Sequence, residues 1–135
     1  MVSTILRLRT KQKEEFLDIT DLVSEAVKRL DKTGKAKACL VFSTHTTTAL
    51  IINENNDSNL LTDIKNTLTS LVPEKDYLHN IIDNNASAHI KSSLLGNSLI
   101  VPLENSQLVL GTWQRILLLE FDGPRNREVF VQTLD

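Results

Sequence analysis

The run Ile116-Leu117-Leu118-Leu119 places the tightest constraint on how this chain can fold. Successive side chains of a strand point to opposite faces, so a strand over 114–121 would be apolar on both faces. Such a strand is stable only at the centre of a sheet that is covered on each side. The chain of 135 residues, 41% of them hydrophobic, is long enough to build that core as one domain over residues 1–135.

The rest of the pattern alternates short strands with helical segments and predicts an α+β fold with two main helices and one short helix. Thr20 is expected to cap the first helix, and Asp57 or Ser58 the second. Ser87 is expected to cap the short helix, which would make His89 its second residue. The expected strands are 2–10, one ending near residue 19, 38–44, 46–53, 98–101, 107–110, 114–121 and 128–133, and the expected helices are 21–32, 58–72 and 88–95.

The three histidines of the chain, His45, His79 and His89, stand among small polar residues and not in apolar runs. Imidazole titrates near neutrality and is the commonest metal ligand in proteins. Three neutral rings around an open coordination position would form a catalytic zinc site. Their separations of 34 and 10 residues match no compact zinc motif, so the residues alone leave open whether the rings meet.

Charge and composition narrow the function classes. The formal net charge is -2, whereas a nucleic-acid surface usually needs a basic balance, so no nucleic-acid partner is expected. No apolar run approaches the roughly 20 residues of a membrane helix, and no charged-then-apolar leader opens the sequence. The expected location is therefore the cytoplasm, with no membrane partner. Cys39 is the one cysteine, which rules out a disulfide within the chain.

Several motifs together resemble the YjbQ family. They cover nearly the whole chain and are His45-Thr46-Thr47-Thr48-Ala49-Leu50 with Asn53-Glu54-Asn55, the segment 88–96 (AHIKSSLLG), the segment 110–116 (LGTWQRI), and the segment 120–127 (EFDGPRNR). The resemblance implies a compact domain with a mixed, strongly bent sheet, assembled as a homotrimer. Members are mostly uncharacterised and are also labelled secondary thiamine-phosphate synthases. The family's histidines map onto His45, His79 and His89 and its acidic position onto Glu54, and the resemblance implies that they hold a divalent metal, with zinc expected.

On this reading the chain is a metal-dependent enzyme that acts on a small phosphorylated or heterocyclic substrate. Glu54 or Asp83 would orient a histidine or act as a base. The groups that would hold anionic oxygens are Thr46, Thr47, Lys91 and Arg125. Thiamine-phosphate synthesis would instead favour magnesium on a diphosphate, and three imidazoles suit magnesium poorly because it prefers oxygen ligands.

Two other readings stay open. The chain could be a non-catalytic trimeric module that binds a small anion or a metal, or a scaffold whose histidines only form hydrogen bonds. Trp113 is expected in the core and not as a platform for a ligand. A backbone position with positive φ in the 83–87 loop would fall to Asn84 or Asn85, which tolerate it. The strand 128–133 is expected to be covered by the sheet or by a neighbouring subunit.

Overall fold

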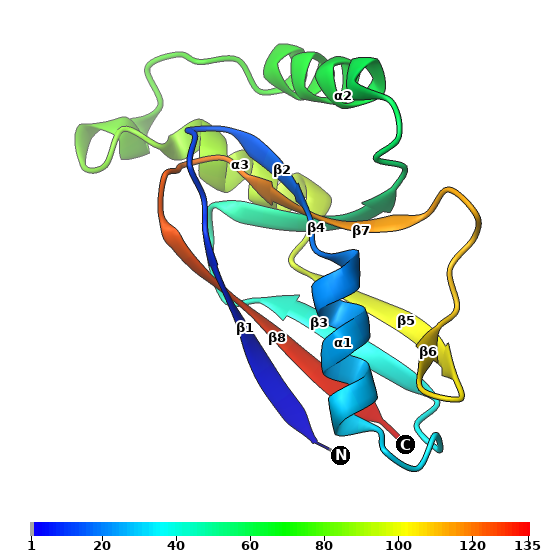
Figure 1. Ribbon diagram of the computed structural model, residues 1–135. Helices are drawn as coiled ribbons and strands as arrows, with labels where there is room; N and C mark the ends of the chain where they lie inside the picture. The colour runs from blue at the N-terminus through cyan, green and yellow to red at the C-terminus, as the bar shows by residue number, and fades with distance from the viewer. Residues whose placement is uncertain (1) are drawn as a thin grey trace.

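The computed structural model describes residues 2–135, and their strands form two antiparallel sheets (Figure 1). The larger sheet has the order β1-β8-β3-β5-β6, and the smaller has the order β2-β7-β4. The expected fold class is confirmed, although every strand pairing found here is antiparallel where a mixed sheet was expected. The strands are β1 Ser3–Arg9, β2 Glu15–Asp18, β3 Ala38–Ser43, β4 Thr48–Asn53, β5 Ser98–Glu104, β6 Gln107–Leu108, β7 Arg115–Glu120 and β8 Asn126–Leu134.

Helices cover both faces of the smaller sheet. The buried face of α1 (Thr20–Leu30) packs into the core that the two sheets share, and α2 (Ser58–Leu71) and α3 (Ala86–Leu95) pack against the other face. A short 3-10 helix, η1 (Leu78–Ile81), lies in the segment between α2 and α3 and projects from the body of the molecule (Figure 1). None of the helices within residues 2–135 is long and apolar enough to span a bilayer.

The strand β7 confirms the prediction made from its apolar run. It lies between β2 and β4, and its four residues 116–119 are 0% exposed. Ile116 and Leu118 pack into the core shared with α1 and the larger sheet, whereas Leu117 and Leu119 pack into the second core with α2 and α3. Burial of one such side chain contributes about 1.5–3 kcal/mol, so this strand is the centre of the fold's stability.

Two of the three expected helix caps are wrong. The first helix has Ile19 at its N-cap, and Thr20 is instead buried, with its hydroxyl accepting the Ile116 N–H at 2.7 Å. The hydroxyl of Thr20 bonds to β7 and so cannot cap the helix. It is needed there because the N–H of Ile116 would otherwise lack a partner. The second helix begins as expected, because the Asp57 side chain accepts the N–H of Asn59 at 2.9 Å.

The short helix also begins earlier than expected, at Ala86 with Asn85 at its N-cap. His89 is therefore its fourth residue, and its N–H is bonded to the Asn85 carbonyl at 3.3 Å. Ser87 lies inside the helix, where its hydroxyl donates to the Glu74 carboxylate. The expected positive φ is confirmed at Asn84, with φ of 54°. The last strand, β8, is covered by the sheet, since it lies between β1 and β3.

Candidate functional site

A polar pocket lies where the ends of β3, β7 and β8 meet the start of α3. Its volume is about 330 Å³. We call it the histidine pocket because two of the three histidines line it. Its lining residues are Thr44, His45, Thr46, Thr47, Asp83, Asn85, His89, Asp122, Arg125 and Arg127.

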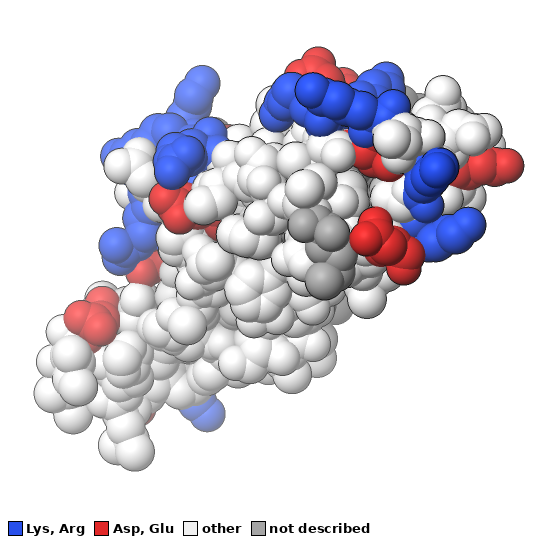
Figure 2. All heavy atoms as spheres, turned by 90° about the horizontal axis from the view of Figure 1, so that it is seen from below, with Lys and Arg blue, Asp and Glu red and all other residues white. Residues whose placement is uncertain are grey.

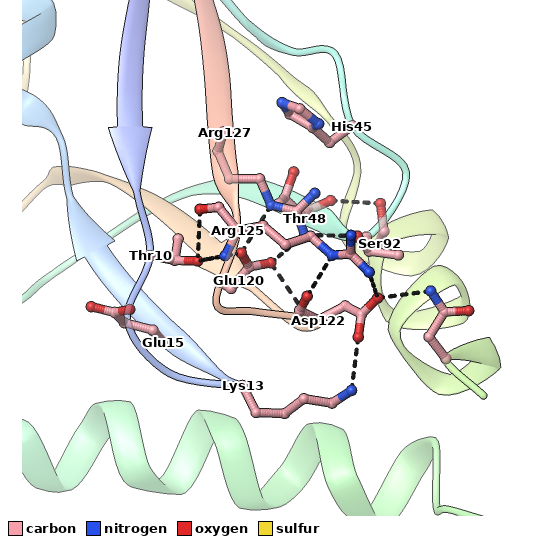
Figure 3. Close-up of polar contacts among 12 residues, drawn as sticks. Thr10, Lys13, Glu15, His45, Thr48, Ser92, Glu120, Asp122, Arg125 and Arg127 are labelled. Carbon is pink, nitrogen blue, oxygen red and sulfur yellow. Dashed lines mark hydrogen bonds and ion pairs between the residues drawn. The ribbon is translucent and has the colours of Figure 1, made fainter. Parts of the chain in front are cut away.

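A buried ion pair forms the floor of the histidine pocket (Figure 3). Glu120, at the end of β7, is 0% exposed and accepts from both Nε and Nη2 of Arg127, the Nε bond being 2.9 Å long. Thr10 donates its hydroxyl to Glu120 at 2.7 Å, and Arg127 also donates to the hydroxyl of Thr47 at 2.8 Å. Burial would raise the pKa of Glu120, but these hydrogen bonds and the charge of Arg127 lower it overall. The pair therefore stays ionised and fixes the strands that carry the pocket.

The carboxylate of Asp122 ties the two sides of the pocket together. It accepts from Lys13 Nζ at 2.7 Å, from Asn85 Nδ2 at 2.8 Å and from Arg125 Nη2 at 3.0 Å. Burial would raise the pKa of Asp122, but these three donors outweigh it and lower the pKa to about 2. Arg125 keeps a side chain that is 53% exposed, so it remains accessible to a ligand at the rim.

His45 is held by the backbone of β8. Its Nε2 accepts the N–H of Glu128 at 2.8 Å. Burial and the positive charge of Arg127 lower the pKa of His45 from its ordinary 6.5, against the opposing charges of Glu128 and Glu120. The ring is thus neutral near pH 7, and because Nε2 is an acceptor, the ring proton lies on Nδ1. His45 can offer a ligand one N–H donor.

His79, His89 and Asp83 form a second group beside the same pocket. The rings of His79 and His89 meet edge to face, with centroids 4.8 Å apart and planes at 87°. The Oδ2 atom of Asp83 lies 3.6 Å from Nε2 of His79, which is beyond hydrogen-bond distance. His79 packs behind His89 and does not itself line the pocket.

Two buried side-chain atoms in this region have no hydrogen-bond partner. They are Nε2 of His79 and Oδ1 of Asn85, and within residues 2–135 no other buried side-chain nitrogen or oxygen lacks one. Leaving a buried polar atom unsatisfied costs about 1–3 kcal/mol. Because Asn85 lines the histidine pocket, a ligand there would recover that cost for its Oδ1 atom, whereas His79 does not line the pocket.

The arrangement fits a metal only in part. Nε2 of His79 offers a buried lone pair, but Nε2 of His45 is already engaged by the N–H of Glu128. Across the described part of the chain, no three His, Cys, Asp or Glu side chains converge closely enough to hold an ion. The set His45, His79 and His89 therefore does not form a site as the side chains stand, and zinc ligation by it stays a prediction.

Besides His79, two of the predicted site residues, Glu54 and Lys91, do not line the histidine pocket. Thr46, Thr47, Asp83 and Arg125 line the histidine pocket with His45 and His89. Glu54 follows the far end of β4, because that strand pairs with Glu120 at Thr48 and with Arg115 at Asn53. Five residues of extended strand span about 17 Å, so Glu54 lies about that far from the histidine pocket. Within one chain it therefore cannot act on these histidines.

Lys91 also lies away from the histidine pocket, contrary to its expected role in anion binding. Its side chain is 3% exposed because α3 turns it toward the sheet. There Nζ lies 3.3 Å from the Glu14 carboxylate and 5.6 Å from the centre of the Phe121 ring. An ammonium group held in this way stabilises the contact between α3 and the sheet and does not reach a ligand.

Sequence reasoning missed Asn85 and Asp122 as residues of the site and did not foresee that Arg127 is buried. The signal for Asp122 was its position two residues after the end of the buried strand β7, where the chain leaves the core. Arg127 and Asn85 gave less signal, because a hairpin arginine and a loop asparagine are common on protein surfaces. Only the alternation along β8, in which Arg127 is buried on the same face as Val129 and Val131, shows that Arg127 points inward.

Comparison with known proteins gives a consistent result. The sequence model described as "UPF0047 protein YjbQ-like" matches residues 4–135. A UPF0047 protein of Archaeoglobus fulgidus is 51% identical over 130 residues, which cover 96% of this chain and 98% of the relative. The UPF0047 protein YugU of Bacillus subtilis is 37% identical, over 96% of each chain.

Solved structures agree with this result. A protein of unknown function from Sulfolobus solfataricus, described as YbjQ-like, has a TM-score of 0.91 at 35% identity, covering 98% of this chain and 95% of its own. A yjbq/upf0047 family protein of Clostridium acetobutylicum, described as uncharacterized, has a TM-score of 0.90 at 42% identity, covering 97% and 99%. These matches extend to the whole fold, including the strands that carry the histidine pocket.

Proposed function

The chain belongs to the YjbQ/UPF0047 family, and from that premise we propose that its histidine pocket binds a small phosphorylated or heterocyclic substrate and transforms it. The observation that carries the proposal is a buried atom of the pocket wall without a hydrogen-bond partner, Oδ1 of Asn85. Native proteins leave few such atoms, so each one needs a partner that the side chains and backbone around it do not supply.

The charges around the pocket favour an anionic ligand group at the rim. Arg125 provides an exposed guanidinium, and the neutral ring of His45 provides an N–H donor. The exposed hydroxyl of Thr46 lies on the same wall. These are the donors that bind phosphate or carboxylate oxygens. Oδ1 of Asn85 would accept a hydrogen bond from an N–H or O–H of the same ligand.

Asp83 is the carboxylate left for acid–base chemistry, since Glu54 is remote and Asp122 is held by three donors. It lies 3.6 Å from Nε2 of His79, close enough to orient that ring after a small movement. The proposed division of roles is that Asp83 and His79 position His89, while His45 and Arg125 hold the anion.

A divalent metal, zinc by ligand preference, is the cofactor of this proposal in its metal-dependent form. Of the predicted ligands, His45 is engaged by the backbone, and among residues 2–135 no three side chains converge on an ion as they stand. His79 and His89 would therefore hold the metal only with a movement of Asp83 toward them, and bound metal would polarise a substrate oxygen. Metal analysis of the purified protein tests this directly. One equivalent of zinc that falls in His89→Ala supports the assignment, and full occupancy in both His79→Ala and His89→Ala contradicts it.

Thiamine-phosphate synthesis is proposed only as a side activity. That reaction displaces pyrophosphate, which usually requires magnesium on the diphosphate. Magnesium prefers oxygen ligands, but Asp122 already accepts from Lys13 and Arg125. The histidine pocket therefore suits magnesium poorly, and we expect turnover with those substrates to be slow.

A homotrimer is also proposed, because the segment around η1 exposes apolar side chains beside the pocket. Leu78, Ile81 and Ile82 are 88%, 85% and 78% exposed. The same projecting segment lies at the left of Figure 2, and most of the face seen there is uncharged. A second copy covering it would shield His79 and Asp83 from water. Light scattering should give three times the 15.2 kDa chain mass, and a monomer at micromolar concentration would contradict the trimer.

Calorimetric titration with inorganic pyrophosphate tests ligand binding. We expect Arg125→Ala to weaken binding about tenfold, while Asn66→Ala, an exposed residue on α2, serves as the matched control. A panel of phosphate esters then separates an enzyme from a binding module. Turnover that survives purification and is lost in His45→Ala and His89→Ala supports catalysis, and tight binding without turnover supports the non-catalytic module.

A further inference from the structure

A second pocket lies at the opposite end of the smaller sheet. It has a volume of about 330 Å³ and is lined by Asp18, Asn55, Asn56, Thr112, Trp113 and Arg115. We call it the tryptophan pocket. It shares no lining residue with the histidine pocket, and the β4–β7 ladder separates the two by about 17 Å. What it binds is therefore independent of the proposed function.

One wall of the tryptophan pocket is Arg115, whose side chain is held in place by Asp18 and Asp21, which also balance its charge. Nε of Arg115 donates to Oδ2 of Asp18 at 2.7 Å, and Nη2 donates to Asp21 at 3.3 Å. Burial would raise the pKa of Asp18, but hydrogen bonds from Arg115, Thr20 and Asn55 lower it to about 2. Since the two charged lining residues neutralise each other, the tryptophan pocket does not select for an anion.

The second wall is the indole of Trp113, which was expected in the core. It is 61% exposed. The turn that carries it is held by Gln114, whose side chain accepts the N–H of Gly111 at 2.8 Å and whose own N–H donates to the Gly111 carbonyl at 3.1 Å. A large aromatic ring in a braced turn beside a pocket is a ready stacking surface.

The remaining lining residues supply hydrogen bonds without charge. Nδ2 of Asn55 donates to Asp18 at 3.2 Å, which leaves the carbonyl oxygen of that side chain as an acceptor. Asn56 and Thr112 add an amide and a hydroxyl. Neutral donors and acceptors around an aromatic face match the edge of a heterocyclic base.

We propose that the tryptophan pocket binds a neutral planar heterocycle of the nucleobase type. The ring stacks on Trp113, and its polar edge pairs with Asn55 and its neighbours. The volume of about 330 Å³ is at the small end for ligand sites, so it suits one ring system and not an extended chain.

Trp113 is the single tryptophan of the chain, so its emission reports on this pocket alone. The probes are adenosine and cytidine, with inorganic phosphate as the anionic comparison. We expect saturable quenching by at least one nucleoside and none by phosphate. Affinity measured by calorimetry should fall about tenfold or more in Trp113→Leu and less in Trp113→Phe. Asn55→Ala should also weaken binding.

Val109→Ala is the matched control, because Val109 is an exposed apolar residue near Trp113 in the sequence that does not line the tryptophan pocket. The affinity of the Val109→Ala variant for the nucleosides should equal that of the unaltered chain. Circular dichroism of each variant checks that the fold is retained. The proposal is overturned if quenching by both nucleosides is linear and unsaturated, or if Trp113→Leu binds as tightly as the unaltered chain. It is equally overturned if the emission responds only to protein concentration, which would mean that a second copy covers Trp113.

Discussion

Removing the charge of the buried Glu120 should destabilise this protein more than removing the charge of an exposed carboxylate. Glu120→Gln keeps the shape of the side chain but leaves the guanidinium of Arg127, which is 4% exposed, without its anionic partner. The variant also weakens the bond from Thr10, which is 2.7 Å long in the parent. Breaking a buried ion pair from one side costs about 3–5 kcal/mol, because the remaining charge stays desolvated.

Urea unfolding followed by circular dichroism measures this cost. With a slope of about 2 kcal/mol per molar urea, the midpoint should fall by about 1.5–2.5 M. Glu104→Gln, an exposed glutamate at the end of β5, should change the free energy of unfolding by less than about 0.5 kcal/mol.

The double variant Glu120→Leu with Arg127→Met separates an ion-pair effect from a packing effect. Replacing both members with apolar groups removes the uncompensated charge, so most of the lost stability should return. A loss below about 1 kcal/mol in Glu120→Gln, or a double variant as unstable as the single one, would refute the reasoning.

Three further predictions follow from the charges and the exposed surface. Because the folded-state pKa of His45 lies below 6.5, its contribution to stability is complete above that pH and is lost as pH falls; His45→Asn should flatten the pH dependence of urea midpoints between 7 and 5. Asp18 and Asp122, with pKa values lowered from 3.8 to about 2, contribute stability that is lost between about pH 4 and 2, so Asp122→Asn should shrink that acid loss. Ile81→Asp, at a side chain 85% exposed, should yield monomers by light scattering with little change in melting temperature, and an intact trimer would count against the proposed contact.

How far the sequence could predict this structure depends on whether an interaction is local. The apolar run at 116–119 fixed the place of β7, because both faces of a strand can be judged from neighbouring letters. Asp57 was recognised as a cap for the same reason, since its partner is two residues away. Thr20 was misjudged because its partner, Ile116, is 96 residues distant.

The functional site shows the same limit. The motif that contains His45 indicated the pocket, but nothing in the letters around Lys91 shows that it pairs with Glu14, 77 residues earlier. Glu54 was expected to orient a histidine or act as a base because it matches the family's acidic position, whereas the length of β4 separates it from the histidine pocket. These two placements could not be predicted from the sequence, because closeness along the chain does not determine closeness in space.

A crystal structure of the protein grown with zinc and pyrophosphate tests the central claim most directly. The account predicts a bound group in the histidine pocket that contacts Arg125 and His45 and supplies a partner for Oδ1 of Asn85. A pocket filled only by water, with Oδ1 of Asn85 bonded instead to a group of the chain, would contradict it.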